Sequence, residues 1–512
     1  MSNNSANNKL VAKNTIILYF RMLLLMGVGF YTSRVVLQVL GVEDYGIQNV
    51  VAGFLSMFGI ITSSMSAAIS RFITVELGKG ELNRLKAVFA TSIAVQLAMA
   101  VILIIAIESF GYWFVSHKMN IPLGREDAAL WCLHCATITT LLNLINVPYN
   151  SAIIAHEKMS VFAYLSILDA VLKLVICYVI SISPFDKLNT YATLLVVVSC
   201  VNNLVYLIYC HTKFAECRFK LSFNKTIFKE IWGFAGWSFF GNTAWILNNQ
   251  GVNMLMNIFH GVVVNDARGI ASQVDGIINK FVTNYMMALN PQITKTYAAG
   301  NKQYAFALAC RGARFSFYIL LFLALPIMIE ADKVLSIWLG TPPDQSANFF
   351  IWTVVSSLIM TMGNTLVTLQ NAHGNIKHYQ IWITIFGYIP FPATWIVFKL
   401  LNAPAIWAYF IFTLVYWFLL FVRFYLVHQS TGIPAKQYLT GVVLKCHIVG
   451  FLSAILPILI HFLMEESFLR LILVGLVSVV SSGVVIYFYG MEPSERTLVM
   501  GIVKKFTSKL HK

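Results

Sequence analysis

The sequence predicts an all-α polytopic membrane protein with about fourteen transmembrane helices. Of its 512 residues, 58% are hydrophobic and only 11% are charged, whereas an average soluble domain is about 25% charged. The apolar residues form continuous runs and not the alternating pattern of a membrane β-barrel. Lys and Arg outnumber Asp and Glu, which gives a net charge of +15, and they gather in alternate connecting segments. These observations exclude a soluble enzyme and a secreted disulfide-rich domain.

Each expected span is a run of about 20 apolar residues, the length that crosses the hydrocarbon core of a bilayer. The second and eighth runs are polar and rich in glycine, so twelve or thirteen spans remain as alternatives. The runs are 15–38, 46–69, 88–114, 128–150, 161–183, 191–210, 232–258, 267–290, 312–332, 348–371, 380–400, 404–427, 442–463 and 468–489.

The basic residues predict the orientation of these spans. If the N-terminus is cytoplasmic, twenty-five of the 36 Lys and Arg residues fall in cytoplasmic segments and seven fall on the other side. The remaining four, Arg21, Arg34, Lys173 and Lys280, are counted as lying inside spans, and basic residues near the end of a run are counted with the adjoining segment. Cytoplasmic loops of membrane proteins carry the excess of Lys and Arg. We therefore expect a multi-pass membrane protein with both termini in the cytoplasm.

A faint internal repeat predicts two six-helix lobes. Gly46-Ile47 follows Glu43-Asp44-Tyr45, and Gly269-Ile270 follows Asp266-Ala267-Arg268 with an offset of 223. Gly78-Lys79-Gly80 and Gly300-Asn301-Lys302 then close the two polar spans with an offset of 222. Because the offset covers six spans, an even number, both copies have the same orientation, as in transporters built from parallel repeats.

The repeat divides the chain into five expected parts, and the last two spans lie outside it. The parts are an N-lobe at 1–210, a basic cytoplasmic linker at 211–231, a C-lobe at 232–427, two extra helices at 428–489 and an amphipathic cytoplasmic tail at 490–512.

Charged residues inside the spans are the first candidates for a binding site, because a charge at the bilayer centre costs about 2.5–3.5 kcal/mol on insertion scales. Arg21 and Arg34 lie in the first span, and a bend at Gly27 or Gly29 could bring them to one cavity. The alternative for Arg34 is that its side chain reaches the membrane interface.

The fifth and eighth spans carry acidic and basic residues together. Asp169 and Lys173 are four residues apart, which allows an ion pair on one helix face. This pair either is structural or aims the Lys173 ammonium at a substrate. In the eighth span, Arg268 and Asp275 share a polar face with Ser272 and Asn279, and Lys280 is a separate candidate contact.

The seventh span carries a row of polar residues that a regular helix places on one face: Ser238, Asn242, Asn249, Asn253 and Asn257. Such a row either forms hydrogen bonds between helices or lines a wet cavity, and we favour the cavity. Basic residues exceed acidic ones in this space, which suits an anionic substrate that bears sugars. Asn242, Asn249 and Asn253 are therefore candidate substrate-binding residues.

We expect no cofactor, no metal site and no catalytic residues. The sequence has no GxxxxGK[ST] phosphate loop, and its eleven His residues have no metal-ligand spacing. Cys132 and Cys135 form a CxxC pattern, but they open a hydrophobic span and are interpreted as small buried residues.

Several short motifs occur along the chain and are the most specific signals in the sequence. They are Leu18-Tyr19-Phe20-Arg21, Tyr31-Thr32-Ser33-Arg34, Leu40-Gly41-Val42-Glu43-Asp44-Tyr45-Gly46, Glu76-Leu77-Gly78-Lys79-Gly80, Asn120-Ile121-Pro122 and Asn290-Pro291. These motifs resemble the O-antigen and capsule repeat-unit flippases of the multidrug/oligosaccharidyl-lipid/polysaccharide exporter superfamily. The span plan is similar over nearly the whole chain.

The resemblance implies a V-shaped, two-lobed transporter that works by alternating access. Its substrate would be an undecaprenyl-pyrophosphate-linked oligosaccharide, carried across the inner membrane for surface polysaccharide synthesis. Arg21 and Arg34 match the pyrophosphate-binding role by motif. Lys173, Arg268 and Lys280 match it only as basic residues in suitable spans.

The expected partners are this lipid-linked sugar, the bilayer and the polysaccharide polymerase machinery, and no nucleic acid is expected. The membrane potential, with ion coupling through Asp169 or Asp275, is the hypothetical driving force. A cation-coupled multidrug antiporter of the same superfamily is one alternative. A membrane glycosyl-transferring enzyme is another.

Overall fold

The computed structural model describes residues 2–56, 58–117, 121, 124–218, 223–497 and 500. The described residues form helices and contain no strand. The longer helices are α1 (Ser2–Ser56), α2 (Gly59–Lys79), α3 (Leu82–His117), α4 (Glu126–Ala155), α5 (Met159–Ile182), α6 (Lys187–Lys213), α7 (Lys225–Ile246), α8 (Val252–His260), α9 (Val262–Ala298), α10 (Lys302–Ile329), α11 (Ala331–Leu339), α12 (Ser346–His373), α13 (Lys377–Gly387), α14 (Pro390–Leu401), α15 (Ile406–Thr431), α17 (Lys445–Leu463) and α18 (Phe468–Val485). Short helical segments are η1 (Ala215–Cys217), η2 (Leu247–Gly251), α16 (Ala435–Tyr438), η3 (Leu439–Leu444) and η4 (Ile486–Gly490).

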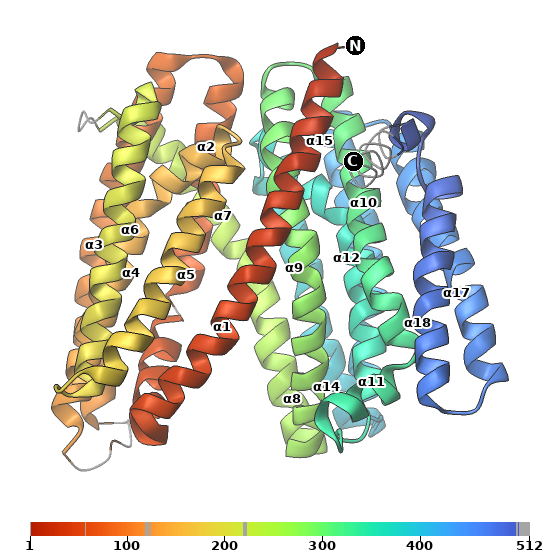
Figure 1. Ribbon diagram of the computed structural model, residues 1–512. Helices are drawn as coiled ribbons and strands as arrows, with labels where there is room; N and C mark the ends of the chain where they lie inside the picture. The colour runs from red at the N-terminus through yellow and green to blue at the C-terminus, as the bar shows by residue number, and fades with distance from the viewer. Residues whose placement is uncertain are drawn as a thin grey trace, which may run out of the picture. The chain divides into compact units, whose positions relative to one another are not determined.

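The chain forms two compact units. Unit 1 comprises Met1–Asn242 and Met287–Asn301, and unit 2 comprises Thr243–Met286 and Lys302–Lys512. In unit 1, α4 packs against both α3 and α6, and α1 packs along α5 (Figure 1). In unit 2, α12 packs on α10 and α15. Each unit is thus a bundle of long helices with its own interior.

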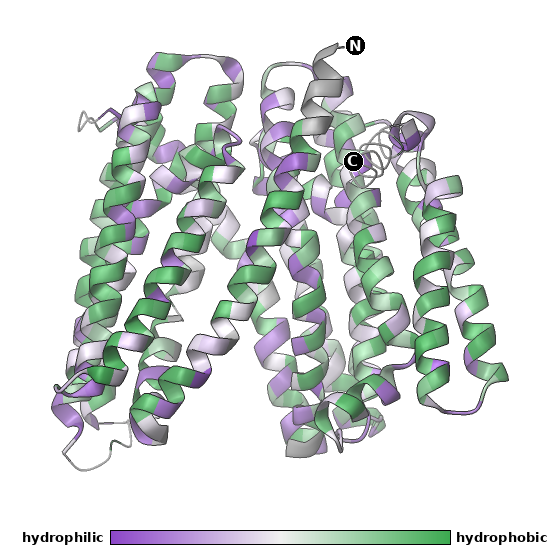
Figure 2. Ribbon diagram, viewed as in Figure 1, coloured by the Kyte–Doolittle hydropathy of each residue, from purple (hydrophilic) through white to green (hydrophobic). Residues whose placement is uncertain are grey.

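Eleven helices of the described residues are long and apolar enough to cross a membrane. They coincide with eleven of the fourteen predicted spans, and Figure 2 shows hydrophobic residues along most of α17 and α18. The other three predicted spans fall on the end of α1 with α2, on α7 with α8, and on α9. These helices carry the polar side chains discussed below. The predicted fold class, an all-α polytopic membrane protein, is confirmed.

Two pairs of glycines make the internal repeat visible in the backbone. Gly41 (φ 79°, ψ 170°) breaks α1, and Gly261 (φ 85°, ψ −178°) separates α8 from α9. Gly80 and Gly300 both have positive φ after α2 and α9. Each pair is 220 residues apart, close to the sequence-based offsets of 223 and 222. Residues with a Cβ rarely adopt these angles, so the same break is built into both copies.

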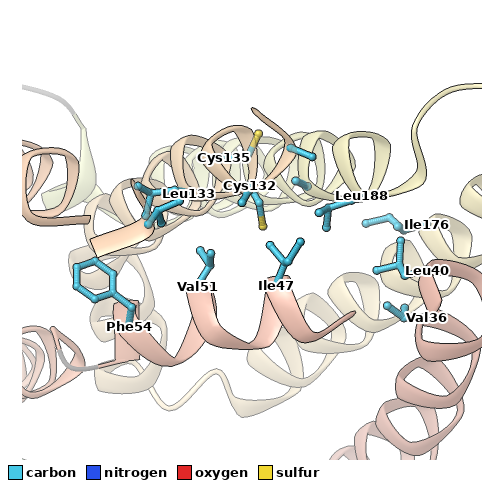
Figure 3. Close-up of a cluster of buried hydrophobic side chains, with 14 of the residues drawn as sticks. Val36, Leu40, Ile47, Val51, Phe54, Cys132, Leu133, Cys135, Ile176 and Leu188 are labelled. Atoms are coloured by element: carbon cyan, nitrogen blue, oxygen red, sulfur yellow. The ribbon is translucent and has the colours of Figure 1, made fainter. Parts of the chain in front are cut away.

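A hydrophobic cluster in unit 1 holds the two parts of α1 against α4, α5 and α6. Figure 3 shows Val36 and Leu40 before the break at Gly41 and Ile47 and Val51 after it, around Cys132 and its neighbours. Cys132 and Cys135 are both buried free thiols. No group of three or more metal-ligating side chains occurs in the part of the chain that the structure describes. The interpretation of the CxxC pattern as small buried residues fits this cluster.

An ion-pair cluster fixes the loops at one end of unit 1. Arg125 precedes α4 and donates hydrogen bonds to Asp44, after the α1 break, and to Asp186, which caps α6; its Nε lies 2.8 Å from Asp44 Oδ1. Burial raises the pKa of Asp186, but the hydrogen bond from Arg125 outweighs it, so the pKa lies below its ordinary value. Asp44, which belongs to the repeat motif, thus has a structural partner in Arg125.

The last two long helices, α17 and α18, are held to α10 at both ends. Next to the end of α10, the buried Glu330 accepts hydrogen bonds from Arg470 (2.9 Å) and pairs with His461 (2.8 Å). Near the start of α10, Arg311 and Arg314 contact the buried Glu495 at 2.9 and 2.8 Å. These helices therefore belong to unit 2.

Three predictions lie wholly or partly outside the described residues. Most of the expected amphipathic tail at 490–512 is one of them, as are residues 219–222 of the expected linker and the Asn120 and Pro122 positions of the outer motif.

Candidate substrate-binding site

A polar cavity of about 320 Å³ lies inside unit 2, between α9, α12 and α15. The π-helical turn η2 contributes one further wall residue. Charged, hydroxyl, amide and aromatic side chains line it together: Asn249, Arg268, Ser272, Asp275, Gly276, Thr353, Ser356, Ser357, Met360, Tyr409, Phe412 and Tyr416. Three of the candidate residues from the sequence, Asn249, Arg268 and Asp275, therefore meet in one place.

Arg268 supplies the positive charge of this cavity. Its side chain is 8% exposed, and its guanidinium carbon lies 5.8 Å from the ring centroids of both Tyr409 and Phe412. Aromatic faces attract a cation in this position. Its Nη1 contacts the sulfur of Met256 at 3.8 Å. No ion pair among the described residues includes Arg268, so its charge is available to an anionic ligand.

Asp275 lies on the same face of α9 as Arg268, but the two side chains do not pair. Seven residues separate them, which is about 10 Å along a helix. One carboxylate oxygen of Asp275 is buried and has no hydrogen-bond partner. The side chains of Ser357 and Asn279 lie beside the carboxylate. The cavity thus holds a cation and an anion at separate positions, with hydroxyl groups between them.

The row of polar residues predicted for the seventh span is broken by the structure. Leu247–Gly251 forms a π-helical turn, which changes the rotation per residue and ends the regular α-helical register. This turn packs closely against another part of the chain. Asn248 donates a hydrogen bond to the carbonyl of Gly387, and the Phe391 ring lies so near Gly251 that an added Cβ would be 2.7 Å from it.

The candidate Asn residues of this span have different neighbours. Asn249 lines the cavity of unit 2, whereas Asn242 donates a 3.1 Å hydrogen bond to Ser64 in unit 1. Asn253 and Lys280 are absent from the cavity wall, and the side chain of Lys280 is exposed. The one-face prediction assumed an unbroken α-helix, and the π-helical turn at Leu247–Gly251 interrupts that helix.

In unit 1 the candidate pair forms as its spacing predicts. Lys173 Nζ lies 2.8 Å from Asp169 Oδ2, and Asn202 of α6 donates to Asp169 Oδ1 at 2.7 Å. The side chains of Lys173 and Asp169 are 49% and 35% exposed. Lys173 lines a half-open pocket of about 360 Å³ together with Thr32, Ser33, Tyr45, Gln48, Asn49, Val36, Ile176, Cys177, Tyr191 and Leu195. Lys173 is therefore neutralised by one partner and accessible.

The two Arg residues of α1 do not share an environment. The guanidinium of Arg21 lies over the Phe162 ring at 4.4 Å, and its buried Nε makes no hydrogen bond. Tyr206 lies within electrostatic reach of both Arg21 and Asp169. Arg34 is exposed. The only break in the described helix α1 is at Gly41, and the backbone stays helical at Gly27 and Gly29, so no helix break separates the two Arg residues.

Sequence reasoning missed Arg423. The charge pattern places it among the twenty-five cytoplasmic Lys and Arg residues, but it lies eight residues before the end of α15, within a helix that is apolar enough to span the membrane. The expected span 404–427 already contained it. Facing it on α12 is Gly363, where a Cβ would be 2.7 Å from Arg423 Nη1.

Comparison with known proteins identifies the family. A model of the family described as "Polysaccharide biosynthesis protein" matches residues 11–297, which is more than half of the chain. The chain belongs to this polysaccharide biosynthesis family. A curated relative, the uncharacterized membrane protein EpsK of Bacillus subtilis (strain 168), is 19% identical over 311 residues. The match covers 60% of each of the two chains, so the chain spans less than two thirds of the length of this relative.

Solved structures establish the fold of this family member. The Vibrio cholerae MATE transporter VcmN in its bent form is 16% identical, with a TM-score of 0.66 over 86% of this chain and 100% of that one. A MOP-superfamily transporter of Pyrococcus furiosus is 13% identical, with a TM-score of 0.64 over 82% and 96%. The fold resembles that of these transporters, one of which belongs to the MOP superfamily.

Proposed function

We propose that this protein flips undecaprenyl-pyrophosphate-linked oligosaccharide repeat units across a bacterial inner membrane by alternating access. The product would feed the synthesis of a surface polysaccharide. The observation that carries the proposal is the Arg268 cavity of unit 2, in which a buried guanidinium without an acidic partner faces hydroxyl and amide groups. The family supports the link to polysaccharide synthesis.

The chemistry of the cavity fits the two polar parts of this substrate. A guanidinium forms short, charge-assisted hydrogen bonds with phosphate oxygens, often two at once. Ser272, Ser356 and Asn249 can replace water at sugar hydroxyl groups, each of which loses several kcal/mol if it enters hydrocarbon without a partner. The prenyl chain stays in lipid throughout, because it gains nothing from a polar cavity.

The membrane potential supplies a direction for transport. An inside-negative potential contributes about 2.3 kcal/mol per charge per 100 mV, so the outward movement of a pyrophosphate is favoured. Asp275 in unit 2 and Asp169 in unit 1 are our candidates for ion coupling. We further propose cytoplasmic termini, and roles in substrate contact for Arg21, Arg34, Lys173, Lys280, Asn242 and Asn253 at other stages of the cycle. The polysaccharide polymerase machinery is the proposed protein partner.

The second candidate function is a multidrug antiporter, and the fold and Asp275 favour it. A buried carboxylate with a free oxygen is a suitable site for a cationic drug. One protein with this fold, that of Pyrococcus furiosus, is described as having a binding pocket of reverse polarity that suggests a different function. The fold therefore does not fix the charge of the substrate, and Arg268 favours the anionic one.

Mass spectrometry of the lipids that co-purify with the full chain tests the proposal. The chain is expressed in cells that synthesise a lipid-linked polysaccharide repeat unit. We expect a prenyl pyrophosphate that carries sugars, at least about tenfold depleted in the Arg268→Gln variant and retained in part by Arg268→Lys. Absence of any prenyl pyrophosphate from the native chain would contradict the proposal.

A drug-susceptibility assay separates the two functions. Cells that express the native chain should gain no resistance to cationic drugs, and Asp275→Asn should leave susceptibility unchanged. Resistance that depends on Asp275 would instead support the antiporter.

A further inference from the structure

Arg423 is a second cation within unit 2 that has no acidic partner. No ion pair among the described residues includes it, and its buried Nε makes no hydrogen bond. Its surroundings are the helix α12 at Gly363 and the hydroxyl of the buried Tyr379 on α13. A charged side chain placed two turns inside an apolar helix is costly unless it serves a ligand or a partner.

Arg423 lies on the same face of α15 as two residues that line the Arg268 cavity. Tyr409, Tyr416 and Arg423 follow one another on α15 at intervals of seven residues, so they lie on one helix face at steps of about 10 Å. Tyr409 and Tyr416 line the cavity. Tyr416 is within electrostatic reach of Arg268, Asp275 and Arg423, which makes it the link between the two cations.

Gly363 shows that the position of the guanidinium is built into the packing. A Cβ at Gly363 would lie 2.7 Å from Nη1 and 3.3 Å from Cδ of Arg423. Both distances are shorter than normal contacts between carbon and its neighbours. The missing side chain on α12 thus makes room for Arg423 inside the helix bundle.

We propose that Arg423 forms a second phosphate-binding site, one step along α15 from the Arg268 cavity and on the side toward Thr431. An anionic headgroup would contact Arg423 and Arg268 in succession, with Tyr416 between them. This inference rests on the proposed function, because it assumes that the headgroup is a phosphate or pyrophosphate.

Counting bound headgroups tests the proposal. Farnesyl diphosphate serves as a short prenyl diphosphate probe, and native mass spectrometry counts the molecules bound per full-length chain. We expect two in the native chain, one in Arg423→Gln, one in Arg268→Gln and two in Arg423→Lys. Farnesol, which lacks the diphosphate, and the Lys436→Gln variant of an exposed residue are the controls for binding to detergent-exposed surface.

Gly363→Ala provides a variant that keeps the charge of Arg423 but displaces its guanidinium. We expect it to lose the second probe molecule, with a thermal unfolding midpoint that confirms a folded chain. If Arg423→Gln and Gly363→Ala bind as many probe molecules as the native chain, the second site does not exist and the proposed function stands. If the native chain binds no probe at all, the proposed function itself fails.

Discussion

The two units contain a cavity at the same place in the repeat, and the two cavities differ in chemistry. In unit 1, a cavity of about 220 Å³ lies between the second part of α1, α4 and α6. In unit 2, the Arg268 cavity lies between the corresponding helices α9, α12 and α15. The first is lined by Gln48, Val51, Ala52, Leu55, Cys132, Cys135, Ala136, Thr139, Thr140, Tyr191, Ala192 and Leu195, and none of them is charged.

This difference teaches that the repeat preserves the backbone and not the binding chemistry. With the offset of 220 between Gly41 and Gly261, Gln48 is the residue of the first copy that is equivalent to Arg268 in the second. The helix break, the packing of three helices and the cavity recur, but the charge occurs once. Packing a duplicated bundle needs small and apolar residues in both copies, whereas a charged headgroup needs cations only in the copy that binds it.

The largest effect is expected at the buried ion pair of unit 2, for which the exposed pair of unit 1 is the counterpart. Glu330 of unit 2 is 1% exposed on its side chain and holds Arg470, which is 12% exposed. Glu330→Gln should destabilise the chain by about 3–5 kcal/mol, because a buried cation loses its partner. Thermal unfolding in detergent measures this. A loss below about 1 kcal/mol would show that α17 and α18 do not depend on this pair.

The second prediction sharpens the comparison of the two cavities. Arg268→Gln should weaken binding of the lipid-linked sugar by roughly 10- to 100-fold, because a hydrogen bond to a charged group contributes about 1.5–3 kcal/mol. The matched variant in unit 1, Gln48→Ala, should change binding less than about threefold. A binding assay with the co-purified lipid measures both. Equal losses in the two variants would contradict a site confined to unit 2.

The third prediction tests whether the repeated break costs the same in both units. Gly41→Ala and Gly261→Ala should each lower stability by about 1–3 kcal/mol, the cost of a side chain in a positive-φ, extended-ψ conformation that is essentially confined to glycine. Gly27→Ala, in the helical part of α1 with nothing within 4 Å of an added Cβ, is the control and should not destabilise. Thermal unfolding midpoints of the three variants measure this. An unchanged midpoint in Gly261→Ala would show that the two helix breaks are not equivalent.

The smallest effect is expected at the exposed ion pair of unit 1. Asp169→Asn removes the charge that faces Lys173, and both side chains are at least 35% exposed. Exposed pairs contribute about 0–1 kcal/mol, so stability should change by less than 1 kcal/mol. A dependence of transport on the imposed ion gradient that vanishes in this variant, at unchanged stability, would assign Asp169 the coupling role.

The sequence predicted the elements of this protein well where composition alone determines them. A run of 20 apolar residues has no stable place in water, so eleven spans could be located from hydropathy. Gly41 and Gly261 lie a few residues before the glycines that revealed the repeat, because the charged segments that mark it begin the helices that follow each break.

Tertiary structure decided which polar residues meet. The i, i+7 spacing of Arg268 and Asp275 was enough to place both on one face of α9, and it is what brings them into one cavity. The spacing of the Asn residues in the seventh span could not reveal the π-turn at Leu247–Gly251. That turn lies against Gly387 and Phe391, which come from another part of the chain.

Arg423 illustrates the same limit. Its charge suggested a cytoplasmic position, and only Gly363 on α12 shows that the bundle has room for it. The sequence by itself determined a membrane-embedded, basic, duplicated helical chain, because these properties sum over many residues. The placement of each cation depends on single contacts between distant helices, and those exist only once the bundle has folded.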